Sequence, residues 1–177
     1  SISAMENLYS SAERRLLLSE EKETTIRLGD FMGIIPAITG KVELVYEGEI
    51  EGAAKVAEKL IESAVSRSFL EYFPKVKKLE KEGEINPYSQ LMEWFAKNTD
   101  FQLMDDISEK NYKTKLDSIE PLNELLNTYA PHISKKESYF WKEMILWAMV
   151  ELKKLSKNRV ADGYEFKDLF GSYLSGL

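Results

Sequence analysis

The chain has no cysteine and only one histidine among its 177 residues. The lack of cysteine excludes disulfide bonds, thiolate nucleophiles and zinc sites built on cysteine. One histidine cannot form a histidine-rich metal site, so we interpret His132, which follows Pro131, as an ordinary residue of a loop or helix edge. A chain without cysteine is compatible with the cytoplasm, which is the location we expect.

Long apolar runs and an excess of positive charge are also missing. The longest apolar candidate covers residues 144–152 and is flanked by charged side chains, whereas a membrane helix needs about 20 apolar residues. The formal net charge is −6, opposite in sign to that of a general nucleic-acid binder. The N-terminus lacks the basic-then-apolar pattern of a signal peptide. We therefore expect neither a membrane span nor a nucleic-acid partner.

Common catalytic motifs are also missing from the sequence. The chain contains no G-x-x-x-x-G-K-[ST], no G-x-G-x-x-G and no G-x-S-x-G. An acidic cluster of Glu43, Glu47, Glu49 and Glu51 could in principle bind a hard cation such as Mg²⁺. It lacks the aspartate- and asparagine-rich loop of such sites, so we interpret these side chains as solvated. The sequence alone therefore predicts no catalytic residue and no metal ligand.

What the chain does contain is a series of amphipathic patterns at helical spacing. Apolar residues recur three and four positions apart, which is typical of helices with one buried face. Asp30 and Ser108 are candidate N-caps, and the last long helix begins at Ser134 or Ser138. Gly40 and Pro74 are expected to end helices. The predicted helices cover residues 3–19, 30–38, 52–72, 87–98, 108–119, 121–126, 134–157 and 166–174.

Two short stretches favour extended structure, residues 42–46 and 101–104. Between the helices, residues 75–83 are rich in charge; we interpret them as a linker, with an extension of the preceding helix as the alternative. The predicted fold is mainly α. A helical domain over residues 1–81 is followed by a second, C-terminal helical bundle over residues 82–177, with room for one short extended segment or hairpin.

Several aromatic and basic residues have two interpretations. Trp94, Phe95, Trp141 and Trp147 could form a platform for nucleobases, but at helical spacing they are typical of a core. The adjacent residues Arg14 and Arg15 could grip a phosphate with their guanidinium groups. Adjacent residues of a helix point about 100° apart, so at most one of the two arginines needs to be buried. The simpler interpretation is a surface ion pair of Arg14 or Arg15 with a neighbouring glutamate.

Two strings in the first half of the chain carry a resemblance to a known family. One is SAMENL followed by AERRL, over residues 3–16; the other is IPAITGKVELVYEGE, over residues 35–49. Together they resemble the magnesium chelatase I-subunit-like AAA+ ATPases. The similarity continues through residues 53–74, is weaker over residues 94–126, and does not extend to residues 127–177.

The resemblance implies an architecture and a set of partners. In that family an α/β nucleotide-binding core precedes a small helical lid, so this chain would begin just inside the lid. The P-loop, the Mg²⁺-binding acids and the arginine finger would lie upstream, and ATP and Mg²⁺ would belong to the parent protein. The family also implies a homo-oligomeric ring and a partner protein with a von Willebrand-type domain.

The resemblance also bears on Arg14. The sensor arginine of an AAA+ lid normally sits near the start of a lid helix, but residues 1–13 contain no arginine. We expect that residue upstream of Ser1, with Arg14 as the alternative nucleotide-sensing candidate. Within the fingerprint at residues 35–52, we expect Gly40→Val to damage folding or lid packing.

The functional hypothesis is a non-catalytic C-terminal region that couples the nucleotide state of the missing core to oligomer assembly or partner binding. The alternative is a free-standing helical module for protein interaction, without ATPase activity. A self-sufficient enzyme is disfavoured because the catalytic motifs are missing.

Overall fold

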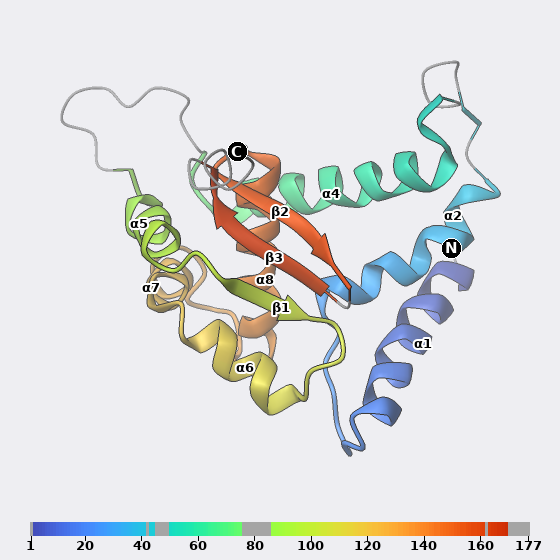
Figure 1. Cartoon of the computed structure of the whole chain (residues 1–177), viewed down its shortest axis with the longest axis horizontal. Helices are drawn as coiled ribbons and strands as arrows, with labels where there is room; N and C mark the ends of the chain where they lie inside the picture. The colour runs from blue at the N-terminus through green and yellow to red at the C-terminus, as the bar shows by residue number, and fades with distance from the viewer. Residues whose placement is uncertain (1, 42, 45–49, 76–85, 162, 170–177) are drawn as a thin grey trace.

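The computed structural model describes residues 2–41, 43–44, 50–75, 86–161 and 163–169. The protein is mainly helical with one small sheet, which confirms the predicted fold class (Figure 1). The helices are α1 (Ile2–Leu18), the 3₁₀-helix η1 (Leu28–Ile34), α2 (Ile35–Thr39), α4 (Ala53–Tyr72), α5 (Ser89–Lys97), α6 (Glu109–Asp117), α7 (Glu120–Tyr129) and α8 (Lys135–Glu151). The strands are β1 (Phe101–Met104), β2 (Leu155–Val160) and β3 (Gly163–Asp168).

The sheet corrects the prediction for the C-terminal end of the chain. Its strands lie in the order β1-β3-β2 and are antiparallel, with Phe101 opposite Phe166 and Val160 opposite Gly163. The expected extension of the 134–157 helix through residues 152–157 is therefore wrong, and so is the start of the expected 166–174 helix, because residues 166–168 are in β3. Residue 169 is helical, and residues 170–174 lie outside the described residues. Leu155, Tyr164 and Phe166 are buried, and they gain that burial by pairing as a hairpin against β1 and α8.

Helix caps confirm two of the predicted boundaries and correct a third. The Ser108 hydroxyl accepts a hydrogen bond from the Asn111 amide, and Ser134 forms a reciprocal capping box with Glu137. Asp30 is not an N-cap, because it lies inside η1 and accepts a hydrogen bond from the backbone N–H of Arg27. Of the segment predicted as extended near residue 42, only residues 43 and 44 are described, and they belong to no helix or strand.

The core is centred on α8. Six consecutive residues of α8, from Met144 to Met149, are buried, and α8 packs against α4, α7 and β2. In Figure 1 the sheet lies in front of α8, with α5, α6 and α7 on one side and α1 on the other. A helix buried on nearly every side lacks the polar face of a surface helix, which explains its mixed apolar and aromatic sequence.

The aromatic residues singled out in the sequence belong to this core. Phe95 and Trp147 are almost fully buried, while Trp94 and Trp141 are partly buried and pack against the same cluster. The cluster also contains Phe69 of α4, so helices from both sides of the predicted domain boundary share one core. The boundary at residues 81 and 82 falls outside the described residues, and the division into two domains stays a prediction.

The N-terminal helix α1 is joined to the body by close packing against η1. A Cβ atom added at Gly33 of η1 would come within 1.9 Å of the Ser11 hydroxyl and 3.2 Å of the Ser11 Cβ of α1, so a larger residue there would require the Ser11 hydroxyl to move. The other side of α1 is open: Ile2, Met5 and Tyr9 are exposed. None of the helices in the described part of the chain combines the length and apolar character that a bilayer span requires.

Glycine positions provide a matched test of the hairpin. At Gly163, which has a φ of 157°, an added Cβ would come within 2.4 Å of the Leu103 carbonyl oxygen, whereas at Gly40 it would meet nothing within 4 Å. Gly163→Ala should therefore lower the free energy of unfolding by more than about 2 kcal/mol, because backbone must move. Gly40→Ala should leave it unchanged or raise it by up to about 1 kcal/mol. Urea unfolding measures both.

The space around Gly40 also changes the expectation for Gly40→Val. Gly40 has an ordinary φ of −79° at the end of α2, so neither backbone strain nor packing among the described residues supports the predicted damage. Equal destabilisation by Gly40→Ala and Gly163→Ala would contradict the close packing of β3 against β1.

Candidate functional site

A cavity of about 460 Å³ lies between the N-terminal helices and the sheet. One wall comes from α1 and η1, and the other from the end of β1, the β2–β3 hairpin, α6 and α8. Clefts between structural units are common binding sites. Charged side chains dominate this one: Arg14, Arg15, Arg27 and Arg159 face Asp30, Asp105, Asp106 and Glu143.

The floor of the cleft is a buried ion pair between α1 and η1. The guanidinium of Arg15 donates from Nη2 to Asp30 Oδ2 at 2.7 Å and from Nε to Oδ1 at 3.3 Å. Arg15 also donates to the Thr24 hydroxyl and to the Thr25 carbonyl oxygen. Both charged side chains are more than nine-tenths buried, so each is compensated by the other and by hydrogen bonds, as a buried pair must be.

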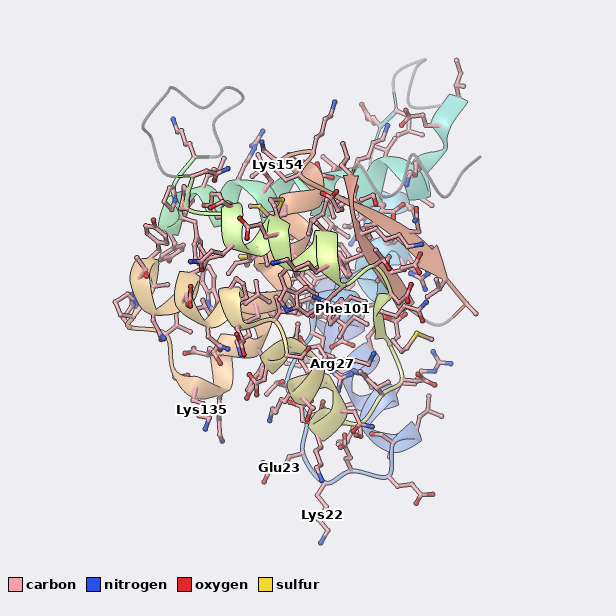
Figure 2. The ribbon with its side chains drawn as sticks, turned by 60° about the vertical axis from the view of Figure 1, so that its left-hand side comes forward. Lys22, Glu23, Arg27, Phe101, Lys135 and Lys154 are labelled. Carbon is pink, nitrogen blue, oxygen red and sulfur yellow. The ribbon has the colours of Figure 1, made fainter. Side chains whose placement is uncertain are left out.

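Arg27 joins η1 to α6. Its guanidinium donates to Glu109 Oε2 at 3.1 Å and to the Ile107 carbonyl oxygen at 2.9 Å. It also lies over the ring of Tyr112, with 4.1 Å between the guanidinium carbon and the ring centroid. Figure 2 shows Arg27 in the interior, away from Lys22 and Glu23 at the tip of the loop that follows α1. Arg27 Nε is buried without a hydrogen-bond partner among the described residues.

Glu109, at the start of α6, has contacts with the 24–27 segment and with its own helix. Besides Arg27, it accepts a hydrogen bond from the Thr25 hydroxyl at 2.9 Å and pairs with Lys113. Burial acts to raise the pKa of Glu109, but the hydrogen bonds from Arg27, Thr25 and Lys113 outweigh it and lower the pKa below its ordinary value. Glu109 therefore stays ionised and holds the 24–27 segment against α6.

Glu143 of α8 completes this polar network from the other side. Its Oε2 accepts a hydrogen bond from the backbone N–H of Leu28 at 2.8 Å and another from the Tyr112 hydroxyl at 2.8 Å. Burial raises the pKa of Glu143 to about 6, and these two hydrogen bonds and Arg27 lower it only in part. A carboxylate on the buried face of α8 thus holds the start of η1. We name the set Arg15, Asp30, Arg27, Glu109 and Glu143 the polar joint.

The mouth of the cleft is more open and less tightly paired. Arg159 of β2 donates to the Tyr164 hydroxyl at 2.7 Å and reaches Asp105 at 3.5 Å. Burial raises the pKa of Asp105, and the neighbouring Arg159 offsets this only in part. Shifted carboxyl pKa values in a cleft are a marker of functional sites, although structural networks produce them too.

Arg14, the nucleotide-sensing candidate, lies on α1 at this cleft. It is exposed and lines the cavity, and no partner for it exists among the described residues. Its neighbour Arg15 is instead buried in an ion pair with Asp30. Neither arginine therefore forms the predicted surface ion pair with a neighbouring glutamate among the described residues. The two side chains point in different directions because adjacent residues of a helix are about 100° apart.

The other residues weighed from the sequence lie elsewhere. Glu51 pairs with Lys59 at the surface, and Glu43 is exposed; Glu47 and Glu49 fall outside the described residues. His132 is exposed and lies beside the Tyr72 ring. Within the described ranges, no three histidine, aspartate or glutamate side chains gather closely enough to hold a metal ion.

Sequence reasoning missed Arg27 and Glu143. One signal was available for Glu143, because Lys142 and Glu143 interrupt the aromatic and apolar residues of α8, and charges on a buried helix need partners. Nothing local pointed to Arg27, whose partners are about 80 residues away. Chemically, most carboxylates of the polar joint are already paired, so the arrangement holds elements together rather than activating a nucleophile.

The two adjacent arginines form a matched pair for testing the polar joint. Arg15→Ala should lower the free energy of unfolding by about 3–5 kcal/mol, because it leaves the Asp30 charge buried and uncompensated. Arg14→Ala should change it by less than about 0.5 kcal/mol. Chemical denaturation of both variants measures the difference. The double variant Arg15→Ala/Asp30→Ala should recover part of the loss; simple additivity would contradict the pairing.

The raised pKa of Glu143 predicts that the stability of the protein depends on pH. That pKa is about 6 in the folded protein against an ordinary value of 4.5, so the folded state binds the proton more tightly. Its contribution to stability is therefore greatest below pH 4.5 and falls as the pH rises to about 6, by roughly 2 kcal/mol. Glu143→Gln keeps an acceptor for the Leu28 N–H and removes the titration.

The measurement is the difference in unfolding free energy between the natural protein and Glu143→Gln from pH 4 to pH 8. Subtraction removes the titration of Glu109 and Asp105, which both proteins share. We expect the difference to grow in favour of Glu143→Gln across pH 4.5–6. Glu143→Leu, which leaves the Leu28 N–H and Tyr112 hydroxyl unpaired, should destabilise at every pH. A flat difference curve would show that Glu143 does not titrate in this window.

Comparison with known proteins adds no assignment. No protein-family model matches the chain, and no curated protein or solved structure gives a significant match. The resemblance seen in the sequence therefore remains a hypothesis.

Proposed function

We propose that this chain is a non-catalytic C-terminal region of a magnesium chelatase-like AAA+ ATPase. In this proposal it couples the nucleotide state of an upstream ATPase core to ring assembly or to binding of a partner protein. The polar joint is the observation that carries the proposal. The resemblance over residues 3–74 supplies the family.

The polar joint gives α1 a stiff connection to the rest of the molecule. Arg15 and Asp30 fix α1 to η1, and Arg27 with Glu109 fixes η1 to α6. The Leu28 N–H then ties η1 to α8 through Glu143. Displacing α1 alone would leave buried charges uncompensated, at a cost of several kcal/mol. A displacement of α1 is therefore expected to move the rest of the molecule with it as a rigid body, as domain-closure mechanisms require.

Arg14 fits this proposal as a residue that meets the nucleotide or the upstream core. It is exposed in the lining of the cleft, on the same helix that the polar joint anchors, and it has no partner among the described residues. A guanidinium in that position is available to a phosphate. ATP and Mg²⁺ would be held by the parent protein rather than by this chain.

The alternative is a free-standing interaction module without ATPase activity. The exposed apolar residues of α1, Ile2, Met5 and Tyr9, favour some contact with another protein surface. The coding sequence upstream of Ser1 separates the two proposals. A P-loop motif in the same reading frame supports the ATPase region, and its absence supports the module.

Glu109→Gln tests the coupling itself in that longer protein. The substitution weakens the ion pair between the partly buried side chain of residue 109 and Arg27. It leaves no cavity, because glutamine keeps the size of glutamate. We expect unchanged ATP affinity and about tenfold weaker coupling between ATP binding and assembly, within the usual range of coupling energies. Analytical ultracentrifugation with and without ATP measures assembly, and Lys97→Met, at the exposed end of α5, is the control.

Two results would contradict the proposal. One is a Glu109→Gln protein that assembles with ATP as well as the Lys97→Met control does. The other is ATP hydrolysis by the isolated chain, because the proposal assigns the phosphate-binding machinery to an upstream domain.

A further inference from the structure

A second cavity, of about 430 Å³, is lined by the end of α6, by α7 and the loop after it, and by the first half of α8. It shares no lining residue with the charged cleft. Its walls carry Lys135 and Lys142, Asp117, the amides of Asn123 and Asn127, and Ser138. The cavity therefore has two cations and one anion among its polar groups.

The anion in this cavity is already used. Asp117 Oδ1 accepts a hydrogen bond from the Lys142 ammonium, and Asp117 Oδ2 accepts one from the Tyr139 hydroxyl at 3.0 Å. Lys142 also lies over the Tyr139 ring. The Lys142 side chain is only 3% exposed, whereas that of Asp117 is about half exposed. Lys142 is therefore a fixed part of the cavity wall and not a mobile surface charge.

The polar groups of the lining that lack a hydrogen-bond partner among the described residues are mostly donors. An ammonium has three N–H groups, and the described residues supply Lys142 with one hydrogen bond, to Asp117. The side chains of Asn123, Asn127 and Lys135 have no hydrogen-bond partner in the described part of the chain. Lys135 projects from the first turn of α8 (Figure 2).

The charges in the lining do not cancel. Glu137, the acid of the first turn, is held by the Ser134 backbone and hydroxyl and does not line the cavity. With the Asp117 charge balanced by Lys142, the charge of Lys135 remains uncompensated within the lining.

We infer that this cavity is a binding site for a small oxyanion-bearing molecule, a phosphate monoester or a carboxylate. Lys142 and Lys135 bind the oxyanion, and the amides of Asn123 and Asn127 hold hydroxyl groups on the remainder of the molecule. This site is independent of the proposed coupling function, because the polar joint contributes no residue to it.

The test is a titration of the full chain with inorganic phosphate, followed by amide NMR at constant ionic strength. We expect saturable shifts at the side-chain amides of Asn123 and Asn127 and at Ser138, with a dissociation constant of the order of 1 mM. Lys135→Met, at the surface, and Lys142→Met should each weaken binding by about tenfold or more, as for a lost charge-assisted hydrogen bond. Lys97→Met is the matched control.

Acetate and chloride complete the experiment. Saturation by acetate but not by phosphate would assign the site to carboxylates, and the reverse to phosphate monoesters; both support an oxyanion site. The inference would be overturned by chemical shifts that grow linearly with phosphate without saturating, or by equal shifts with chloride. It would also be overturned if Lys135→Met bound phosphate as well as Lys97→Met does. Because Lys135 is exposed, its variant tests the site even if Lys142→Met fails to fold.

Discussion

The structure depends on burying charge between elements that are distant in sequence. Arg15 and Asp30 cannot leave water separately, since an isolated buried charge costs several kcal/mol, and their pairing brings α1 onto η1. Arg27, Glu109 and Glu143 extend the same requirement to α6 and α8. Apolar packing would hold these elements together in many orientations, whereas directed hydrogen bonds select one. The N-terminal helices therefore have a defined position over the sheet.

Much of the helical architecture could be predicted from the sequence, because its signals are local. Ser108 and Ser134 cap helices as their spacing indicates, and the apolar periodicity of residues 52–72 marks α4 correctly. The C-terminal hairpin could not be predicted in this way. Leu155, Tyr164 and Phe166 are buried because β3 pairs with both β1 and β2 and because the hairpin packs against α8. A helical pattern and a short apolar run look alike over so few residues.

The candidate site was harder still to predict. Arg14 was selected from the sequence and lies at the cleft, yet the residue beside it proved to be the buried member of the ion pair. Arg27 and Glu143 acquire their roles from partners about 80 and 115 residues away. A single sequence carries no sign of such pairings, apart from the isolated charges on the otherwise apolar α8.

The hydrogen bond from Leu28 to Glu143 spans 115 residues, and this distance has a consequence for biosynthesis. Contacts of high sequence separation close late and slow folding. During translation α1 and η1 emerge well before α8, so Arg15 and Asp30 can pair with each other while Leu28 and Arg27 still lack their distant partners. The N-terminal segment thus stays incompletely packed until α8 has been made, and until then its exposed apolar residues are accessible to chaperones.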